Sequence, residues 1–237
     1  MNGKGGSNSM KRIGILGGMS YESTLKYYDL ILQKYFEKYN DYQYPEIVIF
    51  SLNFQKLIDY ELGDDKEKYI EYLMSGIKSL ERSGVSFIVM AANSPHAVFE
   101  ELENLSKVPF LSIVKATVNK AKQENMKKLL LLGIKFTMQS LFYQNYCKKL
   151  DIEVITPTEA EQDEINSIIF DELVIGLFKQ ESRSRMIQII KHYKVDGVIL
   201  GCTELPLILN QSDTEVKLLD TVELHTEAAL NYYLSLK

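Results

Sequence analysis

Short apolar runs alternate with longer helical segments along almost the whole chain, and this alternation constrains the fold more than any other feature. Six runs have the length and composition of buried strands: 12–16, 46–52, 87–90, 128–133, 152–156 and 197–201. The segments between them, such as STLKYYDLILQKYFEKY and KYIEYLMSGIKSLERSG, carry apolar residues at helical spacing. Strands that are apolar throughout and are separated by helices form parallel sheets with both faces covered. The sequence therefore predicts an α/β fold.

The second half of the chain resembles the first half. The segment RIGILGGMSYEST and its Tyr-rich helix resemble KLLLLGIKFTMQS followed by LFYQNYCKKL, and SGVSFIVMAANSPH resembles YKVDGVILGCTELP in the same order. Two duplicated halves are expected to form two similar lobes. Ligands of open parallel sheets bind at the carboxyl ends of the strands and often between domains. The segments GGMS, AANSPH, GIKFT and GCTE are therefore expected to face one cleft.

The composition is typical of a cytoplasmic globular protein. The 237 residues are 46% hydrophobic with a net charge of -5 and no block of basic residues, so nucleic acid is not an expected partner. No apolar run is long enough to cross a bilayer, and the start of the chain has no signal-peptide core. Residues 1–9, MNGKGGSNS, are interpreted as a tag or a flexible leader. Two cysteines and three scattered histidines predict neither a disulfide framework nor a metal site.

Cys202 is the foremost candidate for chemistry. A lone cysteine is more often a small buried hydrophobic residue, but Cys202 follows an apolar strand and precedes an expected helix. Free backbone amides and the helix dipole at that position would lower the pKa of the thiol and supply thiolate near neutral pH. Cys147 lies within a helical segment and is interpreted as a packing residue.

Glycines and polar residues follow the other strands. GILGGMS lacks a nucleotide-binding fingerprint, and Gly17 and Gly18 are instead expected to let backbone amides approach a small anion such as a carboxylate. Asn93 and Ser94 could bind a carboxylate or an ammonium group, or form a turn and cap the next helix.

For the histidines and for Lys179, both a role in the site and an ordinary structural or surface role remain open. His96 could be an acid or a base, or a structural hydrogen-bonding group, and His192 and His225 are weaker candidates. Lys179 could pair with a substrate carboxylate or be an ordinary exposed lysine.

Several of these segments resemble a known family. GILGGMSYEST, the strand followed by NSPH, LLGIKFTM, DTVELH and above all VILGCTELPLIL are similar to the cofactor-independent aspartate/glutamate racemases, close to their aspartate racemase branch. The resemblance runs from Met10 to the C-terminus. It implies two pseudosymmetric α/β lobes with the active site between them, a homodimer, and racemisation of aspartate or glutamate without pyridoxal phosphate or another cofactor. The implied N-terminal lobe comprises residues 10–114 with 215–237, and the implied C-terminal lobe comprises residues 115–214.

The resemblance also implies a mechanism with one cysteine on each face of the substrate α-carbon. One thiolate removes the α-proton and the other thiol returns a proton on the opposite side. Cys202 matches the second cysteine, whereas Ala92 stands at the position of the first. The substrate-binding residues implied by the resemblance are Met19, Ser20, Asn53, Asn93, Ser94, Thr137, Lys179 and Thr203.

The methyl group of Ala92 cannot exchange a proton, and this leaves four interpretations open. A water molecule, Ser94 or His96 could act on that face of the substrate. The protein could be a single-cysteine decarboxylase like the arylmalonate decarboxylases of the same superfamily, in which loss of CO₂ creates the carbanion. Ala92 could be an engineered replacement of a cysteine, or the chain could be an amino-acid binding module. We predict an amino-acid racemase with reduced or altered activity.

Overall fold

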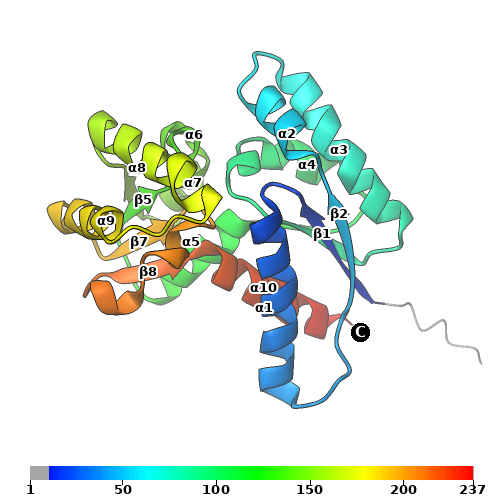
Figure 1. Ribbon diagram of the computed structural model, residues 1–237. Helices are drawn as coiled ribbons and strands as arrows, with labels where there is room; N and C mark the ends of the chain where they lie inside the picture. Colours follow the sequence, from blue (N-terminus) through cyan, green and yellow to red (C-terminus); the bar gives the residue numbers. More distant parts are fainter. Residues whose placement is uncertain (1–10, 237) are drawn as a thin grey trace, which may run out of the picture.

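The computed structural model describes residues 11–236, so the predicted leader at 1–9 lies outside the described residues. They form two lobes, each built on a four-stranded parallel sheet (Figure 1). The strand order is β2-β1-β3-β4 in the first lobe and β6-β5-β7-β8 in the second. The strands are β1 (Arg12–Gly17), β2 (Glu46–Ser51), β3 (Phe87–Met90), β4 (Phe110–Leu111), β5 (Lys128–Leu132), β6 (Glu153–Ile155), β7 (Gly197–Leu200) and β8 (Lys217–Asp220). The matching order confirms the predicted α/β fold of two similar halves.

All six predicted strands are present, and their ends differ from the prediction by at most one residue. The short strands β4 and β8 are absent from the prediction. β8 pairs with β7 in the second sheet, although the resemblance assigned residues 217–220 to the N-terminal lobe. The second sheet therefore extends beyond the implied boundary at residue 215.

Helices cover both faces of each sheet. In the first lobe they are α1 (Tyr21–Tyr39), α2 (Phe54–Glu61), α3 (Lys66–Arg82), the 3₁₀ helix η1 (Ser94–Val98) and α4 (Phe99–Leu105). In the second lobe they are α5 (Ile113–Gln123), α6 (Lys135–Gln139), α7 (Phe142–Lys148), α8 (Glu159–Asp171), η2 (Leu173–Ile175), α9 (Gln180–His192), η3 (Leu205–Leu207) and η4 (Gln211–Asp213), and the chain ends with α10 (Thr221–Ser235).

The central strands are apolar throughout because both of their faces are buried. In β5, Leu129 and Leu131 pack on the side of α5 and α7, whereas Leu130 and Leu132 pack on the side of α8 and α9. In the first sheet, α1 and α10 cover one face and α2, α3 and α4 cover the other. This layering leaves the carboxyl ends of the strands as the place where polar residues gather.

The C-terminal helix α10 joins the two lobes by packing against both α1 and α5. It follows β8 of the second sheet but buries Val222 and Ala229 in the core of the first lobe. His225 of α10 accepts a hydrogen bond from the Tyr27 hydroxyl at 2.8 Å and donates one to the Leu111 carbonyl at 3.1 Å. The helix therefore fixes the first sheet relative to the second.

The register of the sheets gives Ala92 and Cys202 equivalent positions. Leu16 of β1 pairs with Met90 of β3, and Leu132 of β5 pairs with Leu200 of β7. Ala92 follows Met90 by two residues, as Cys202 follows Leu200. The structural repeat thus sets a methyl group in one lobe against a thiol in the other.

Candidate active site

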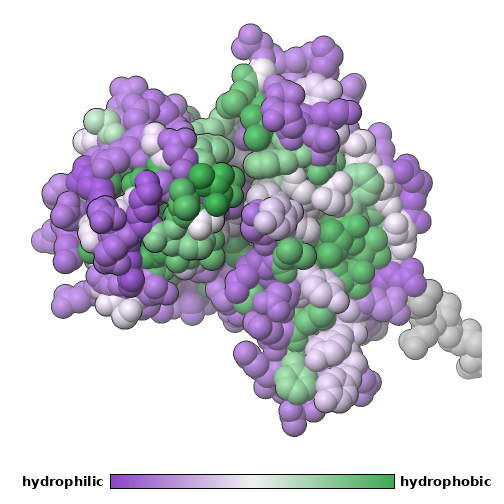
Figure 2. All heavy atoms as spheres, viewed as in Figure 1, coloured by the Kyte–Doolittle hydropathy of each residue, from purple (hydrophilic) through white to green (hydrophobic). Residues whose placement is uncertain are grey.

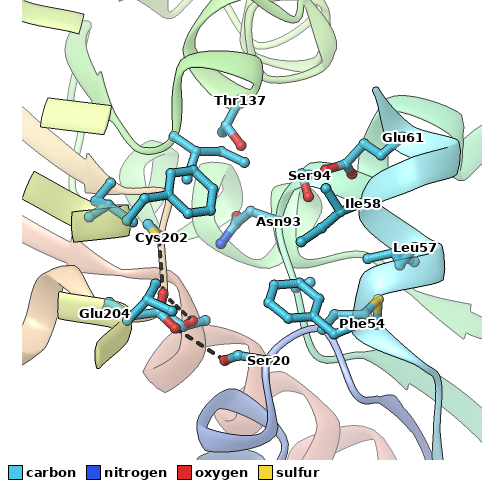
Figure 3. Close-up of a pocket in the computed structure, with 18 residues that line it drawn as sticks. Ser20, Phe54, Leu57, Ile58, Glu61, Asn93, Ser94, Thr137, Cys202 and Glu204 are labelled. Atoms are coloured by element: carbon cyan, nitrogen blue, oxygen red, sulfur yellow. Dashed lines mark hydrogen bonds between the residues drawn. The ribbon is translucent and has the colours of Figure 1, made fainter. Parts of the chain in front are cut away.

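The loops after β1, β3, β5 and β7 meet in one pocket (Figure 3). Its volume is about 600 Å³ with its open mouth included. The four strand ends expected to share a cleft therefore do so. These loops and the first turns of η1 and α6 contribute to its lining Met19, Ser20, Ala92, Asn93, Ser94, Ile134, Thr137, Gly201, Cys202, Thr203 and Glu204.

The carboxylate of Glu204 organises the thiol side of the pocket. It accepts a hydrogen bond from the Cys202 thiol at 2.9 Å and one from the Thr203 hydroxyl at 2.8 Å, both at the same oxygen. Its other oxygen accepts a bond from the Ser20 hydroxyl, 3.1 Å away in the first lobe. Glu204 is buried, and the three donors hold its carboxylate in a fixed orientation beside the sulfur.

The pKa of the Cys202 thiol is raised in the folded protein, contrary to the sequence-based expectation. Burial raises its pKa well above the ordinary value, and the negative charge and hydrogen bond of Glu204 raise it further. Cys202 precedes a turn and the three-residue η3 rather than an α-helix. The expected helix dipole is therefore missing, and the prediction of a lowered thiol pKa is wrong.

Asn93 is held by a buried network that spans the two lobes. Its side-chain nitrogen donates to the Thr221 hydroxyl at 3.0 Å, and its oxygen accepts from the Tyr143 hydroxyl at 2.7 Å. An amide nitrogen carries two hydrogens, so one remains for a ligand. The network orients the Asn93 amide at the pocket wall next to Ser94.

Thr137 presents an unpartnered hydroxyl to the pocket. The side chain is fully buried, and its Oγ1 has no hydrogen-bond partner among the described residues. Buried polar groups without partners are rare and destabilising. A ligand oxygen or nitrogen in the pocket would provide the missing partner.

Three predicted site residues lie outside the pocket. His96 is buried, donates through Nδ1 to the Ala92 carbonyl at 3.0 Å and accepts from the Ile113 amide at 3.2 Å. Burial lowers its pKa to about 3. Lys179 pairs with Glu172 at 3.1 Å, and Asn53 caps α2. These contacts indicate that all three side chains stabilise the fold rather than contact a ligand in the pocket.

The Gly18 amide just after β1 is not free to bind an anion. The Gly18 amide donates to the Thr24 hydroxyl at 2.8 Å. Gly18 has a φ of 81°, and a Cβ at Gly17 would lie 2.4 Å from the Thr24 side chain. Both glycines are required by the tight packing of this turn, so the predicted anion site is not formed at Gly18.

One face of α2 forms a wall that the sequence did not assign to the site. Phe54, Leu57, Ile58 and Glu61 recur at helical spacing and all line the pocket. Figure 3 shows Glu61 near Ser94, across the pocket from Cys202. The sequence feature that could have identified Glu61 is its position. It continues the apolar stripe of Phe54, Leu57 and Ile58, where another apolar residue would be expected.

Apart from Glu61, the pocket walls away from the strand ends are apolar. The second lobe contributes Ile134, Ile169, Phe170 and Val174 opposite the α2 side chains. Figure 2 shows hydrophobic surface on both sides of the hollow between the lobes. An aliphatic ligand stem would fit this environment better than a charged one.

No helix within residues 11–236 is long and apolar enough to cross a membrane. Over the same range, no three histidine, cysteine or acidic side chains are grouped as a metal site would require.

Known proteins share this architecture. The chain is 29% identical over 235 residues to the broad specificity amino-acid racemase RacX of Bacillus subtilis (strain 168), covering 94% of this chain and 98% of that protein. The crystal structure of an aspartate racemase homologue from Pyrococcus horikoshii OT3 superposes with a TM-score of 0.85 at 37% identity, covering 95% and 100% of the two chains. The aspartate racemase of Picrophilus torridus shares the fold, with a TM-score of 0.76 at 24% identity and 94% of each chain covered. Residues 16–229 match the Asp/Glu/Hydantoin racemase family, and the chain belongs to this family.

Proposed function

We propose that this protein is a cofactor-independent, cytoplasmic amino-acid racemase in which Cys202 exchanges a proton with the substrate α-carbon. The observation that carries the proposal is the thiol of Cys202, which faces the pocket and donates a hydrogen bond to the buried carboxylate of Glu204. A binding module has no need of this pair. The racemase names of the relatives support the same reaction.

The pocket offers groups for the main steps of such a reaction. The Thr137 hydroxyl and the free hydrogen of the Asn93 amide can hold the substrate α-carboxylate. The Cys202 thiol can deliver its proton to a carbanion at the α-carbon, leaving its electron pair on sulfur. When Cys202 has to act as a base, Glu204 can accept the thiol proton through their hydrogen bond.

The opposite face of the α-carbon lacks a thiol because Ala92 stands there. The hydroxyl of Ser94 or a water molecule is the candidate carrier on that face, since both ring nitrogens of His96 bond to backbone groups. Slow inversion or one-sided exchange is the expected result. Aspartate and glutamate are the substrates that the resemblance predicts.

Proton exchange in D₂O tests the proposal. The protein is incubated with the L and D forms of aspartate, glutamate and a panel of other amino acids, and loss of the α-proton is followed by NMR, with Cys202→Ser as the inactive variant. Exchange with inversion supports a racemase, and exchange without inversion supports a one-sided site. Binding without exchange for every amino acid would contradict the proposal and favour a binding module.

A decarboxylase is the second candidate, because one thiol suffices when loss of CO₂ creates the carbanion. The single cysteine in the pocket favours it. Release of CO₂ from a substituted malonate, dependent on Cys202, together with no amino-acid exchange, would support this alternative.

A further inference from the structure

The charges of the pocket do not match an acidic substrate side chain. Among the described residues that line it there are two carboxylates, Glu61 and Glu204, and neither lysine nor arginine. Lys179, the predicted partner of a substrate side-chain carboxylate, pairs with Glu172 outside the pocket. An acidic side chain would therefore meet like charges and apolar walls.

The two carboxylates differ in their partners. Glu204 accepts three hydrogen bonds, from Ser20, Cys202 and Thr203. Glu61 accepts bonds only from hydroxyl groups, that of Tyr69 at 2.7 Å and that of Ser94. None of the described lysines or arginines forms an ion pair with Glu61. Glu204 has no cationic partner among them either, but its three hydrogen bonds hold it beside Cys202. Glu61 is therefore the uncompensated carboxylate on the wall across the pocket from the thiol.

The environment of Glu61 favours a cationic partner. Burial raises its pKa above the ordinary value, and the bonds from Tyr69 and Ser94 only partly offset this effect. A partly desolvated carboxylate without a cation is destabilising, and a bound ammonium or guanidinium group would remove that penalty.

The position of Glu61 matches the tip of a long side chain. Phe54, Leu57 and Ile58 form an apolar wall on the same face of α2 that ends at Glu61. Figure 3 shows Cys202 and Glu61 on opposite sides of the pocket. With its α-carbon at Cys202, a substrate would pass an aliphatic stem along this wall and bring its end to Glu61. Long basic side chains combine such a stem with a charged tip.

We propose that the substrates are amino acids with basic side chains, such as lysine, ornithine and arginine, and that Glu61 binds the cationic tip. The reaction itself rests on the proposed function, whereas the substrate class rests on Glu61 and the apolar wall. Glu61 is a specificity-determining residue in this proposal.

The role of Glu61 in binding basic side chains is tested by α-proton exchange and ligand binding with matched amino acids. Lysine is compared with norleucine, which has a similar stem without the charge, and with glutamate, for the wild type and for Glu61→Gln. We expect lysine to exchange its α-proton fastest. Glu61→Gln should lower kcat/KM for lysine about 30-fold or more, mainly through KM, because a desolvated charge pair is broken, while norleucine should change little. Glu71→Gln, an exposed carboxylate on α3, is the matched control.

The outcomes separate the substrate class from the reaction. Faster exchange of glutamate than of lysine, or an equal loss for lysine and norleucine in Glu61→Gln, would overturn the role of Glu61 and leave the racemase standing. If no amino acid exchanges, the proposed reaction fails and calorimetric binding decides the substrate class. Tighter binding of lysine than of norleucine, lost in Glu61→Gln, would then support it, and equal binding would overturn it. Glu61→Lys should reverse the preference toward glutamate.

Discussion

The thiol of Cys202 and the methyl group of Ala92 occupy equivalent positions in the two halves of the pocket. Ala92 is 6% exposed and its methyl group lines the pocket, so a larger side chain there would face the substrate. The neighbouring Asn93 is already oriented by Tyr143 and Thr221. Restoring one proton carrier therefore requires no other change in this part of the site.

We predict that Ala92→Cys increases the rate of inversion by about 100-fold or more, since a positioned acid or base contributes roughly 10²–10⁴-fold. Racemisation of both enantiomers is measured by polarimetry or chiral chromatography. Ala91→Cys is the control because Ala91 is buried on the other face of the strand end and does not line the pocket. A folded Ala92→Cys protein with unchanged inversion would show that the missing thiol does not limit the reaction.

Glu204 controls the protonation state of the neighbouring thiol. Its charge and its hydrogen bond both raise the pKa of Cys202, so Glu204→Gln should lower that pKa while burial still keeps it elevated. We expect iodoacetamide to alkylate Cys202 several-fold faster at a fixed pH near 8. The measurement uses a Cys147→Ala background, although burial already raises the pKa of Cys147 to about 12. Exposed Glu215→Gln should have no effect, and a slower reaction of Glu204→Gln would contradict the assigned role.

The residues next to strand ends could be predicted from sequence, but their partners could not. Cys202 and Thr137 follow apolar strands, and the topology of parallel sheets brings such residues to one edge. Glu61 lies at the end of a helix, and its sequence neighbours do not show which surface that helix covers. The raised pKa of Cys202 likewise depends on Glu204 folding back onto the thiol.

At the scale of elements, the short apolar runs of the sequence predicted six of the eight strands in the described residues and missed β4 and β8. β4 has two residues, and β8 is partly exposed at the edge of the sheet next to β7. Such short strands depend on pairing with a neighbour more than on their own composition. The same dependence on tertiary contacts applies to α10, which follows the second sheet but packs on the first.

We predict that two buried histidines, His96 and His225, make the attachment of η1 and α10 sensitive to acid. Burial lowers the pKa of His96 to about 3 and that of His225 to about 4, whereas in the unfolded chain both titrate near 6.5. Between the folded and unfolded pKa values, the unfolded state binds more protons than the folded state. The contribution of the two neutral imidazoles to the free energy of unfolding is therefore fully present above pH 6.5 and decreases as the pH falls below it. The expected slope is up to about 1.4 kcal/mol per pH unit for each ring.

Urea unfolding between pH 7.5 and 4.5 measures this loss. His225→Gln should lower the stability at pH 7.5 and make its decrease toward pH 4.5 less steep. His192→Gln is the control, because the side chain of His192 is 64% exposed. Equal slopes for the wild type and His225→Gln would contradict a neutral, buried imidazole at this position.

At the scale of the whole molecule, each lobe supplies one wall of the pocket and neither forms the site alone. Ser20 of the first lobe bonds to Glu204 of the second, and Asn93 bonds to Tyr143 and Thr221 beyond its own sheet. The substrate pocket and the contact between lobes are therefore stabilised by the same groups. A ligand that binds both walls should raise the thermal stability of the entire chain.

The outer face of α1 is the surface on which the predicted homodimer can be tested. Tyr21, Leu25, Tyr28, Phe36 and Tyr39 recur every three, four or eight residues along α1 and are 68%, 59%, 44%, 36% and 44% exposed. Figure 1 shows this helix extending past the first sheet, away from the second lobe. Contiguous exposed apolar surface of this kind is typical of interaction sites.

We predict that the wild type sediments with twice the mass of the chain, and that Leu25→Lys combined with Tyr28→Lys sediments as a monomer, because two desolvated ammonium groups would oppose association. Sedimentation equilibrium over a range of concentrations measures both. Leu105→Lys on α4 introduces a charge at another apolar residue, 56% exposed, and should leave the mass unchanged. A monomeric wild type would refute the dimer. A dimeric double variant would mean that another surface forms the contact. Since the pocket lies between the lobes of one chain, a folded monomeric variant should retain proton exchange.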